Sequence, residues 1–545
     1  MGNAKYVTYA DFGAVGDGVT NDFFAIKAAH DFANEKGLPV KADGTKTYLI
    51  TETEVDGVAE TISIKTDTDW CGAHIIIDDT DVAWCEGQNK KYSANIFTVE
   101  SYYPSVRVDE EHIRKINEAG GIDKDTVKKI DTGLGYPAML IVYNENTRHF
   151  IRYGGNQNSG APQKELAVVD KDGNIDPTTP FLFDFDNVSY IVAYRIDVPT
   201  LTLENATITS RASQVNLVDQ YHSINRGIAV TRPNTYIRNI DHKITGEYFK
   251  GELVDGVPFV GHSYNGILGI RSTHNVLVEN FTFQARAYYL QGTYDMGASL
   301  SNMLVFKNCN QSNFFPHHDP DYPLMPAFGK WWGVAGTNFC KNMIYDGCNL
   351  TRYDAHCGVV NGKILNSTIA SIRLTGGGDM LIENTKIYYW NPGTPIQLRE
   401  DYGCTWDGTI TIKDCEFADV TGKGILNNII MHRSSNWNFG YQTTFPNIVI
   451  DNLKFENHKP EMSLLFEFEQ KANQYGFFYR SVMDKNLAVA GALCSDGRPN
   501  ENPQTPPKFI KVINNEKNGY EITLPDVPFF KDTELVGIKL KKSED

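Results

Sequence analysis

The sequence predicts an all-β solenoid, a parallel β-helix in which short strands stack coil upon coil. Two observations support this fold class: a strand–turn phrase that recurs along the middle of the chain, and an opening segment suited to covering a first coil. Length is a third, because 545 residues would otherwise make two or three ordinary domains, whereas a solenoid grows by adding coils.

The recurring phrase is an alternating apolar strand, then Asn or Asp, then a small or apolar residue and a second short strand. Residues 276–283 read VLVENFTF, and residues 380–387 read MLIENTKI. Period-2 alternation indicates a strand, and the Asn indicates a tight turn. Two intervals between anchors are near 20 residues, and the longer ones fit the same unit with an inserted loop. The anchors are Asn205, Asn239, Asn280, Asn308, Gly347, Asn366, Asn384, Asp414 and Asn452.

Stacked coils would bring these anchors above one another, where their amides can bond in a ladder. The residue after each anchor would then point inward, so we expect thiols in that position to pack in the core. These residues are Phe281, Cys309, Cys348, Ser367, Thr385, Cys415 and Leu453. The alternative is a β-sandwich built from hairpins, but nine copies in one register favour the solenoid.

The opening segment predicts an amphipathic helix over 23–36 that covers the first coil. Asp22 suits the first turn and Gly37 suits the C-terminal stop. Short strands are expected at 38–40 and 47–50, and a longer apolar strand over 70–78. A helix across the end hides the open edge of the first coil. Its apolar stripe is Ile26, Ala29, Phe32 and Ala33.

The segment DFGAVGDGVTNDFFAIKAA followed by LPVKADGTKTYLI resembles the opening of pectin-lyase-like right-handed parallel β-helix proteins. The resemblance covers residues 5–80 by motif and 200–455 by repeat pattern. That superfamily includes polygalacturonase-type glycoside hydrolases, pectate and alginate lyases, uronan epimerases and phage tailspikes. The resemblance implies a carbohydrate-directed role and leaves the reaction open. The Asn-Thr-Asp strand and Gly-His-Gly turn of polygalacturonases are absent, which disfavours that activity.

The expected organisation has four parts. Residues 1–85 form the N-terminal cap and first coils, and residues 86–200 form an inserted subdomain with a helix over 109–119. Residues 201–456 form the main coils. Residues 457–545 form a C-terminal tail that packs on the β-helix.

Composition limits the partners and the compartment. A formal net charge of −16 argues against nucleic acid or an anionic membrane as the main partner. No apolar run reaches the length of a membrane span, and no leader is recognised. We therefore expect a cytoplasmic protein, or a secreted or periplasmic one whose leader has been removed. The nine cysteines are odd in number and lack a CxxC pair, which disfavours a disulfide framework and a zinc ribbon.

Each coil should supply one further strand before its ladder phrase, and period 2 fixes the faces of these strands. The expected inward residues are Cys357, Val359, Ile372, Leu374, Ile396 and Leu398. The expected outward residues are Asp354, His356, Arg373, Gln397, Arg399 and Asp401. On coils about 4.8 Å apart, the outward side chains form one polar patch.

This patch and its flanking loops contain residue types that can bind a sugar and catalyse its cleavage. The candidate catalytic residues are Asp354, His356, Asp401 and Asp407. Paired carboxyl groups can divide the work of acid and base or nucleophile, and the more buried one can stay protonated. The candidate substrate-binding residues are Tyr289, Gln291, Trp331, Arg373, Gln397, Arg399 and Trp406.

Each candidate also has a structural alternative. Arg399 and Asp401 can form a salt bridge without a catalytic role, and Asp354 and Asp407 can each stabilise a turn and do nothing else. The loop 317–321, which reads HHDPD, could ligate a metal, but a surface loop is favoured.

Three functions follow, in order of preference. The first is a glycoside hydrolase with paired carboxylates, for which no cofactor is expected. The second is a polysaccharide lyase or epimerase, in which His356 transfers the proton and Arg373, Arg399 or a Ca²⁺ ion neutralises the charge of the intermediate. The third is a glycan-binding, tailspike-like protein. All three take an oligo- or polysaccharide as partner, and oligomeric states from monomer to trimer stay open.

Overall fold

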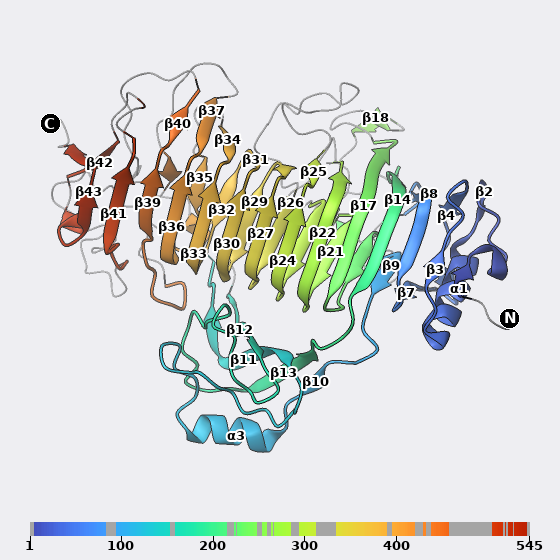
Figure 1. Ribbon diagram of the computed structural model, residues 1–545, viewed down its shortest axis with the longest axis horizontal. Helices are drawn as coiled ribbons and strands as arrows, with labels where there is room; N and C mark the ends of the chain where they lie inside the picture. The colour runs from blue at the N-terminus through green and yellow to red at the C-terminus, as the bar shows by residue number, and fades with distance from the viewer. Residues whose placement is uncertain are drawn as a thin grey trace. The chain divides into compact units, whose positions relative to one another are not determined.

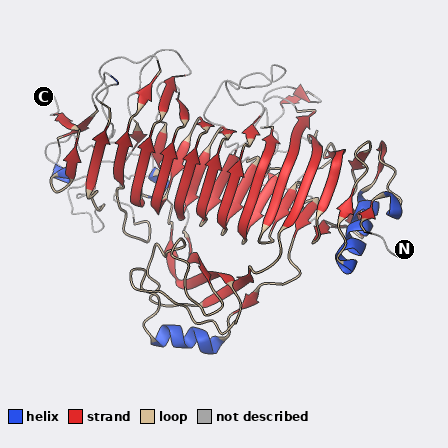
Figure 2. Ribbon diagram, in the orientation of Figure 1, coloured by secondary structure: helices blue, strands red, loops and turns tan. Residues whose placement is uncertain are grey.

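The structure is a computed structural model of the chain, which folds mainly into strands (Figures 1 and 2). It describes residues 5–82, 94–152, 159–214, 223–224, 226–247, 253–254, 256–258, 263–264, 266–284, 294–311, 334–389, 395–419, 429–431, 438–456, 504–515, 518, 522–526 and 528–541. The chain divides into two compact units. The first comprises Met1–Pro104, Tyr194–Gly336 and Gly347–Thr351, and the second comprises Ser105–Ala193, Thr337–Asp346 and Arg352–Asp545.

The first unit is a stack of parallel coils. Its strands pair in register, so that Leu203 lies beside Ile237, and Ile237 beside Val278. All three side chains are fully buried. The strands of the first sheet in this unit are β1 (Val7–Thr8), β2 (Asp17–Asn21), β3 (Val40–Lys41), β4 (Thr47–Ile50), β8 (Thr68–Asp78), β14 (Leu201–Arg211), β17 (Thr235–Thr245), β22 (His274–Phe283), β24 (Asn302–Lys307), β25 (Asn310–Gln311) and β28 (Asn349–Leu350).

A second parallel sheet and short peripheral elements complete the first unit. The second-sheet strands are β7 (Ile62–Ile64), β9 (Phe97–Val99), β16 (Ile228–Val230), β21 (Leu268–Arg271) and β23 (Met296–Ser299). The peripheral elements are η1 (Ala10–Phe12), β5 (Glu54–Val55), β6 (Val58–Ala59), β15 (Ser223–Ile224), β18 (Leu253–Val254), β19 (Val257–Pro258) and β20 (Ser263–Tyr264).

The predicted capping helix is confirmed. Helix α1 spans Phe23–Lys36, and Gly37 ends it with a left-handed φ of 65°. The Asp22 carboxylate accepts hydrogen bonds from the backbone N–H groups of Val15 (2.7 Å) and Gly16 (3.1 Å). Asp22 therefore ties the glycine-rich opening loop to the start of the helix rather than capping the helix itself.

The second unit contains coils of the same kind. Its first-sheet strands are β27 (Lys341–Asp346), β30 (Val359–Leu365), β31 (Thr368–Ile369), β33 (Gly376–Glu383), β34 (Lys386–Tyr389), β36 (Trp406–Lys413), β37 (Glu416–Asp419), β39 (Asn447–Asp451), β40 (Lys454–Phe455), β41 (Phe509–Ile513) and β43 (Glu534–Val536). Its second-sheet strands are the end of β26 (Val334–Asn338), then β29 (Tyr353–Cys357), β32 (Ile372–Leu374), β35 (Ile396–Leu398) and β38 (Ile430–Met431). Short elements are η2 (Glu400–Tyr402), β42 (Thr523–Pro525), η4 (Pro528–Phe530) and β44 (Lys539–Lys541).

The second unit also carries the insertion, which has its own sheet and core. Its elements are β10 (Val106–Arg107), α3 (Glu110–Glu118), β11 (Ala138–His149), β12 (Ala161–Val169) and most of β13 (Tyr190–Arg195). The predicted helix over 109–119 is confirmed, and the Asp109 side chain caps it through the His112 N–H. Figure 1 shows α3 on the side of the insertion away from strands β30 and β33.

The predicted asparagine column is confirmed, because its anchors turn the chain in the left-handed region and bond to one another. In the first unit the Asn239 amide donates to Asn205 (3.0 Å), and the Asn280 amide donates to Asn239 (3.1 Å). In the second unit the Asn384 amide donates to Asn366 (2.8 Å). Positive φ values of 47° to 66° occur at Asn205, Asn239, Asn280, Asn308, Gly347, Asn366, Asn384, Asp414 and Asn452.

The inward positions after the anchors are confirmed as well. Seven residues there are at most 6% exposed: Phe281, Cys309, Cys348, Ser367, Thr385, Cys415 and Leu453. The described cysteines are free thiols. Among the described residues, no helix combines the length and apolarity needed to cross a bilayer.

Candidate functional site

Three neighbouring strands of the second unit bring the predicted polar patch together. Asp354 on β29 pairs in register with Arg373 on β32, which pairs with Gln397 on β35. The flanking residues Ile372 and Ile396 are fully buried. The six residues predicted to point inward are all buried, and Asp354, predicted to point outward, is fully buried as well.

Arg399 connects the two predicted carboxylates. Its Nε and Nη2 atoms bind the Asp401 carboxylate at 3.1 and 2.7 Å, and its Nη1 lies 3.4 Å from Asp354 Oδ1. Arg352 Nη2 pairs with Asp354 Oδ2 at 2.6 Å, and Arg152 Nε pairs with Asp401 Oδ2 at 2.6 Å. We call Arg152, Arg352, Arg373 and Arg399, with the two carboxylates, the arginine cluster.

The arginine cluster has more positive than negative charge. Four guanidinium groups face two carboxylates, an excess of two positive charges. Half-buried Arg373 donates from Nε to Ser371 Oγ at 3.3 Å, and it forms no ion pair with a described residue. Burial and the neighbouring Arg352 lower the pKa of Arg373 to about 9, so this side chain stays cationic at neutral pH.

Both carboxyl groups are held ionised. Burial alone would raise the pKa of Asp354, but the charges of Arg352 and Arg399 outweigh it and bring that pKa below its ordinary value. Burial acts on Asp401 in the same way, and Arg399 lowers its pKa to about 2. The expectation that the more buried carboxyl group stays protonated is therefore wrong. Asp354 is fully buried, yet two arginines stabilise its charge.

His356 is a neutral imidazole beside this cluster. Burial and Arg399 lower its pKa to about 4. Its Nδ1 lies 2.7 Å from Asn338 Oδ1, so Nδ1 carries the proton and Nε2 keeps its lone pair. The ring packs edge-on against Tyr402 at 5.5 Å. His356 is thus unprotonated at neutral pH.

The aromatic ring of Tyr402 packs against two of the arginines. The guanidinium carbons of Arg152 and Arg399 lie 5.4 and 5.3 Å from the centre of its ring. Cation–π contacts of this kind stabilise buried guanidinium groups.

Two other predicted residues lie outside the cluster. Trp406 is fully buried and donates from Nε1 to the Gly378 carbonyl at 2.9 Å, so its proposed role as a sugar platform is wrong. It begins β36 with its ring turned into the core. Asp407 is exposed on β36 beside Gly377, and it contacts none of the described cluster residues. Tyr289, Gln291, Trp331 and the loop 317–321 lie outside the described residues.

Sequence reasoning missed four residues of the site: Arg152, Asn338, Arg352 and Tyr402. Arg352 could have been found, because it stands two positions before Asp354 and so shares its face. No sequence pattern pointed to Arg152 as a site residue, because it lies 249 residues from its partner Asp401.

The cluster does not fit a calcium ion. Its two carboxylates are already bound to guanidinium groups, whose positive charge opposes a cation. Within the described ranges, no three His, Cys, Asp or Glu side chains are arranged to hold a metal.

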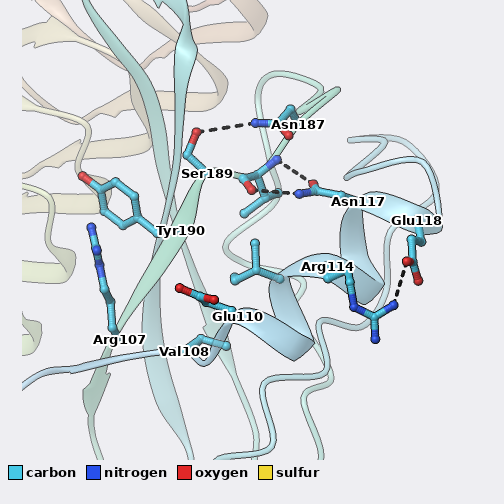
Figure 3. A pocket seen from close by; sticks show the side chains of 11 residues that line it. Arg107, Val108, Glu110, Arg114, Asn117, Glu118, Asn187, Ser189 and Tyr190 are labelled. Carbon is cyan, nitrogen blue, oxygen red and sulfur yellow. Dashed lines mark hydrogen bonds and ion pairs between the residues drawn. The ribbon is translucent and has the colours of Figure 1, made fainter.

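The insertion has a separate groove between α3 and β13, a cavity of about 670 Å³ (Figure 3). Several of its polar groups have partners within the insertion: Asn117 binds the Val188 backbone, and Arg114 pairs with Glu118. Tyr190 stacks on Tyr143, and Arg107 covers the ring at 4.0 Å. These mutual contacts are structural, so the arginine cluster remains the candidate site.

No protein-family model and no curated protein matches the chain. Among solved structures, the chain is similar to the tailspike protein gp49 from Pseudomonas phage LKA1, with 12% identity, coverage of 98% of this chain and 84% of that one, and a TM-score of 0.46. It is also similar to the Gp54 tailspike of Acinetobacter baumannii bacteriophage AP22, solved with a capsular saccharide (10%, 97% and 79%, TM-score 0.45). A third is the Streptococcus pneumoniae adhesin PfbA (11%, 98% and 97%, TM-score 0.35).

Likenesses at this level transfer neither a site nor an activity. The strand register and the asparagine column of this chain establish its architecture directly. Both units of the chain have the right-handed parallel β-helix fold.

Proposed function

We propose that the protein acts on an acidic, uronate-containing carbohydrate and removes the proton next to the uronate carboxylate. One observation carries this proposal: the arginine cluster has an excess of positive charge, and its Arg373 has no ion pair with a described residue. A uronate carboxylate is the anion that such a site would take from a polysaccharide.

Binding would depend on the planar guanidinium of Arg373. Guanidinium groups bind carboxylates through two parallel hydrogen bonds, which fixes the orientation of the sugar ring as well as its position. Gln397 lies beside Arg373 in the register and is half-buried, so its amide can contact a hydroxyl of the same ring.

The chemical step needs a base and a stabilised carbanion. His356 Nε2 accepts the C5 proton, and Arg373 neutralises the charge that develops on the uronate carboxylate. The C5–H electron pair forms the C4–C5 double bond, the C4–O bond breaks, and the departing oxygen takes a proton from water. The bound carboxylate raises the pKa of His356, because an opposite charge nearby favours the imidazolium.

A glycoside hydrolase built on Asp354 and Asp401 is less well supported. Such an enzyme needs one protonated carboxyl group to protonate the leaving oxygen. Here the pKa of each carboxyl is lowered, and one guanidinium, that of Arg399, binds both groups.

The test is incubation of the full chain with polygalacturonate, alginate, glycosaminoglycans and a neutral glucan. We expect an unsaturated, ultraviolet-absorbing product from one uronan and none from the glucan. Arg373→Ala should lower kcat/KM by about 100-fold or more, as loss of one charge-stabilising donor does. Arg148→Ala is the matched control, because Arg148 is exposed and lies outside the cluster.

Two outcomes would overturn the proposal. One is release of reducing sugar without unsaturated product, which would establish a hydrolase. The other is binding of a glycan without turnover, which would establish a binding protein.

A further inference from the structure

Arg152 comes from the insertion, whereas its partner Asp401 belongs to the coils of the same unit. Arg152 Nε lies 2.6 Å from Asp401 Oδ2, and each of these side chains is 17% exposed. Arg399 binds the same carboxylate through two nitrogens. Asp401 is thus held by two arginines, one from the coils and one from the insertion.

The chain just before Arg152 is fixed in an unfavourable conformation. Phe150 has a φ of 53°, in the left-handed region that a bulky residue rarely adopts. Such a residue is strained and persists only where its surroundings hold it. The Ile151 N–H donates to the Phe439 carbonyl at 3.1 Å. The rings that pack around Phe150 at 4.9–6.0 Å belong to Phe183, Phe339, Tyr402 and Tyr441.

A second anchor joins the insertion to β27. Lys341 and Glu165 form an ion pair at 3.3 Å, and their side chains are 1% and 4% exposed. Lys341 also donates to the Pro180 carbonyl, and Glu165 accepts the N–H groups of Leu182 and Phe183 at 2.8 Å. Another placement of the insertion would leave one of these buried charges without its partner, which costs free energy. The ion pair therefore favours the placement seen here.

We infer that the insertion is a fixed wall of the site rather than a lid, and that Arg152 is a positioning residue that holds Asp401 against Arg399. The left-handed turn at Phe150 directs Arg152 toward the coils, and the Lys341–Glu165 pair keeps the insertion in place. The positioning role of Arg152 rests on the proposed function only for the chemical role of the neighbouring His356.

The charged groups that act on His356 come from its own strand, from the segment that follows β35 and from the insertion. They are Asp354 on the same strand, Arg399 after β35, Asp401 in η2 and Arg152. Both arginines lower the pKa of His356, and both carboxylates raise it. Loss of Arg152 should therefore raise the pKa of His356.

The experiment follows the imidazole of His356 by NMR titration of the full chain, with its signal assigned by its loss in His356→Gln. The pKa should rise in Arg152→Ala, stay near the parent value in Arg152→Lys, which keeps the charge, and be unchanged in Arg148→Ala. A parent-like titration in Arg152→Ala would overturn the positioning role.

A second variant tests the anchor at a distance. Glu165→Gln leaves Lys341 buried without its counter-charge, so the insertion should shift and the His356 titration should move in the same direction as in Arg152→Ala. If Arg152→Ala moves the titration and Glu165→Gln does not, the anchor does not position Arg152. Neither titration uses substrate, so failure here is distinguishable from failure to find a uronan that is cleaved.

Discussion

The asparagine column and the arginine cluster of the second unit are both polar, but they satisfy their polar groups differently. In the column the amides donate to side-chain oxygens of the previous coil, as Asn384 does to Asn366, Asn366 to Asp346 and Asn452 to Asp414, so one kind of hydrogen bond repeats along the stack. In the cluster three guanidinium groups share two carboxylates, and a fourth, that of Arg373, forms no ion pair with a described residue. A repeated polar residue therefore serves the fold, whereas an unrepeated and unbalanced group of charges indicates a binding site.

The largest expected effect on stability comes from Arg399, which contacts both Asp354 and Asp401. Arg399→Met should lower the free energy of unfolding by about 3–5 kcal/mol, because it leaves buried carboxylates short of a counter-charge. Arg399→Lys should lose less, since it retains the charge without the planar fork. Urea denaturation measures both variants. Equal stability of Arg399→Met and the parent would contradict the view that these charges depend on one another.

A smaller effect should appear as a pH dependence. Arg399 and Arg152 lower the pKa of Asp401 from 3.8 to about 2. A carboxyl group with a depressed folded pKa stabilises the fold above its unfolded pKa and loses this contribution as the pH falls toward the folded value. The contribution is about 2 kcal/mol at neutral pH.

Asp401→Asn should therefore lower the free energy of unfolding at neutral pH and flatten its decline between about pH 4 and pH 2. Unfolding measured across that window checks the prediction. An unchanged decline in the variant would assign the acid sensitivity to other carboxyl groups.

An effect of similar or smaller size should come from the column. Asn384 has a φ of 47° and donates one hydrogen bond to Asn366. Asn384→Ala should cost about 2 kcal/mol, because a left-handed alanine and a lost hydrogen bond each cost about 1 kcal/mol. Asn384→Gly removes only the hydrogen bond and should cost about half as much.

Thermal unfolding compares the two variants, and activity on uronans should match the parent in both. If Asn384→Gly were less stable than Asn384→Ala, tolerance of the left-handed backbone conformation would not be the contribution of Asn384 to stability.

The coils, their faces and the capping helix follow from local sequence patterns. Alternation of period 2 fixes which side chains enter the core, and an asparagine at each turn is one of the few residues that accepts a left-handed φ. These are local rules, so Asn280 and Asn384 could be assigned without knowing what lies beside them. The register then brought Asp354, Arg373 and Gln397 together as predicted.

The charge state of the site, and the parts of the chain from which its residues come, depend on the tertiary structure. Arg152 reaches Asp401 across 249 residues, and no local pattern encodes such a contact. The ionised state of buried Asp354 depends on Arg352 and Arg399, whose distances from it only the fold defines. Charge interactions depend on separation and burial in space, whereas strand and turn preferences depend on neighbours in sequence.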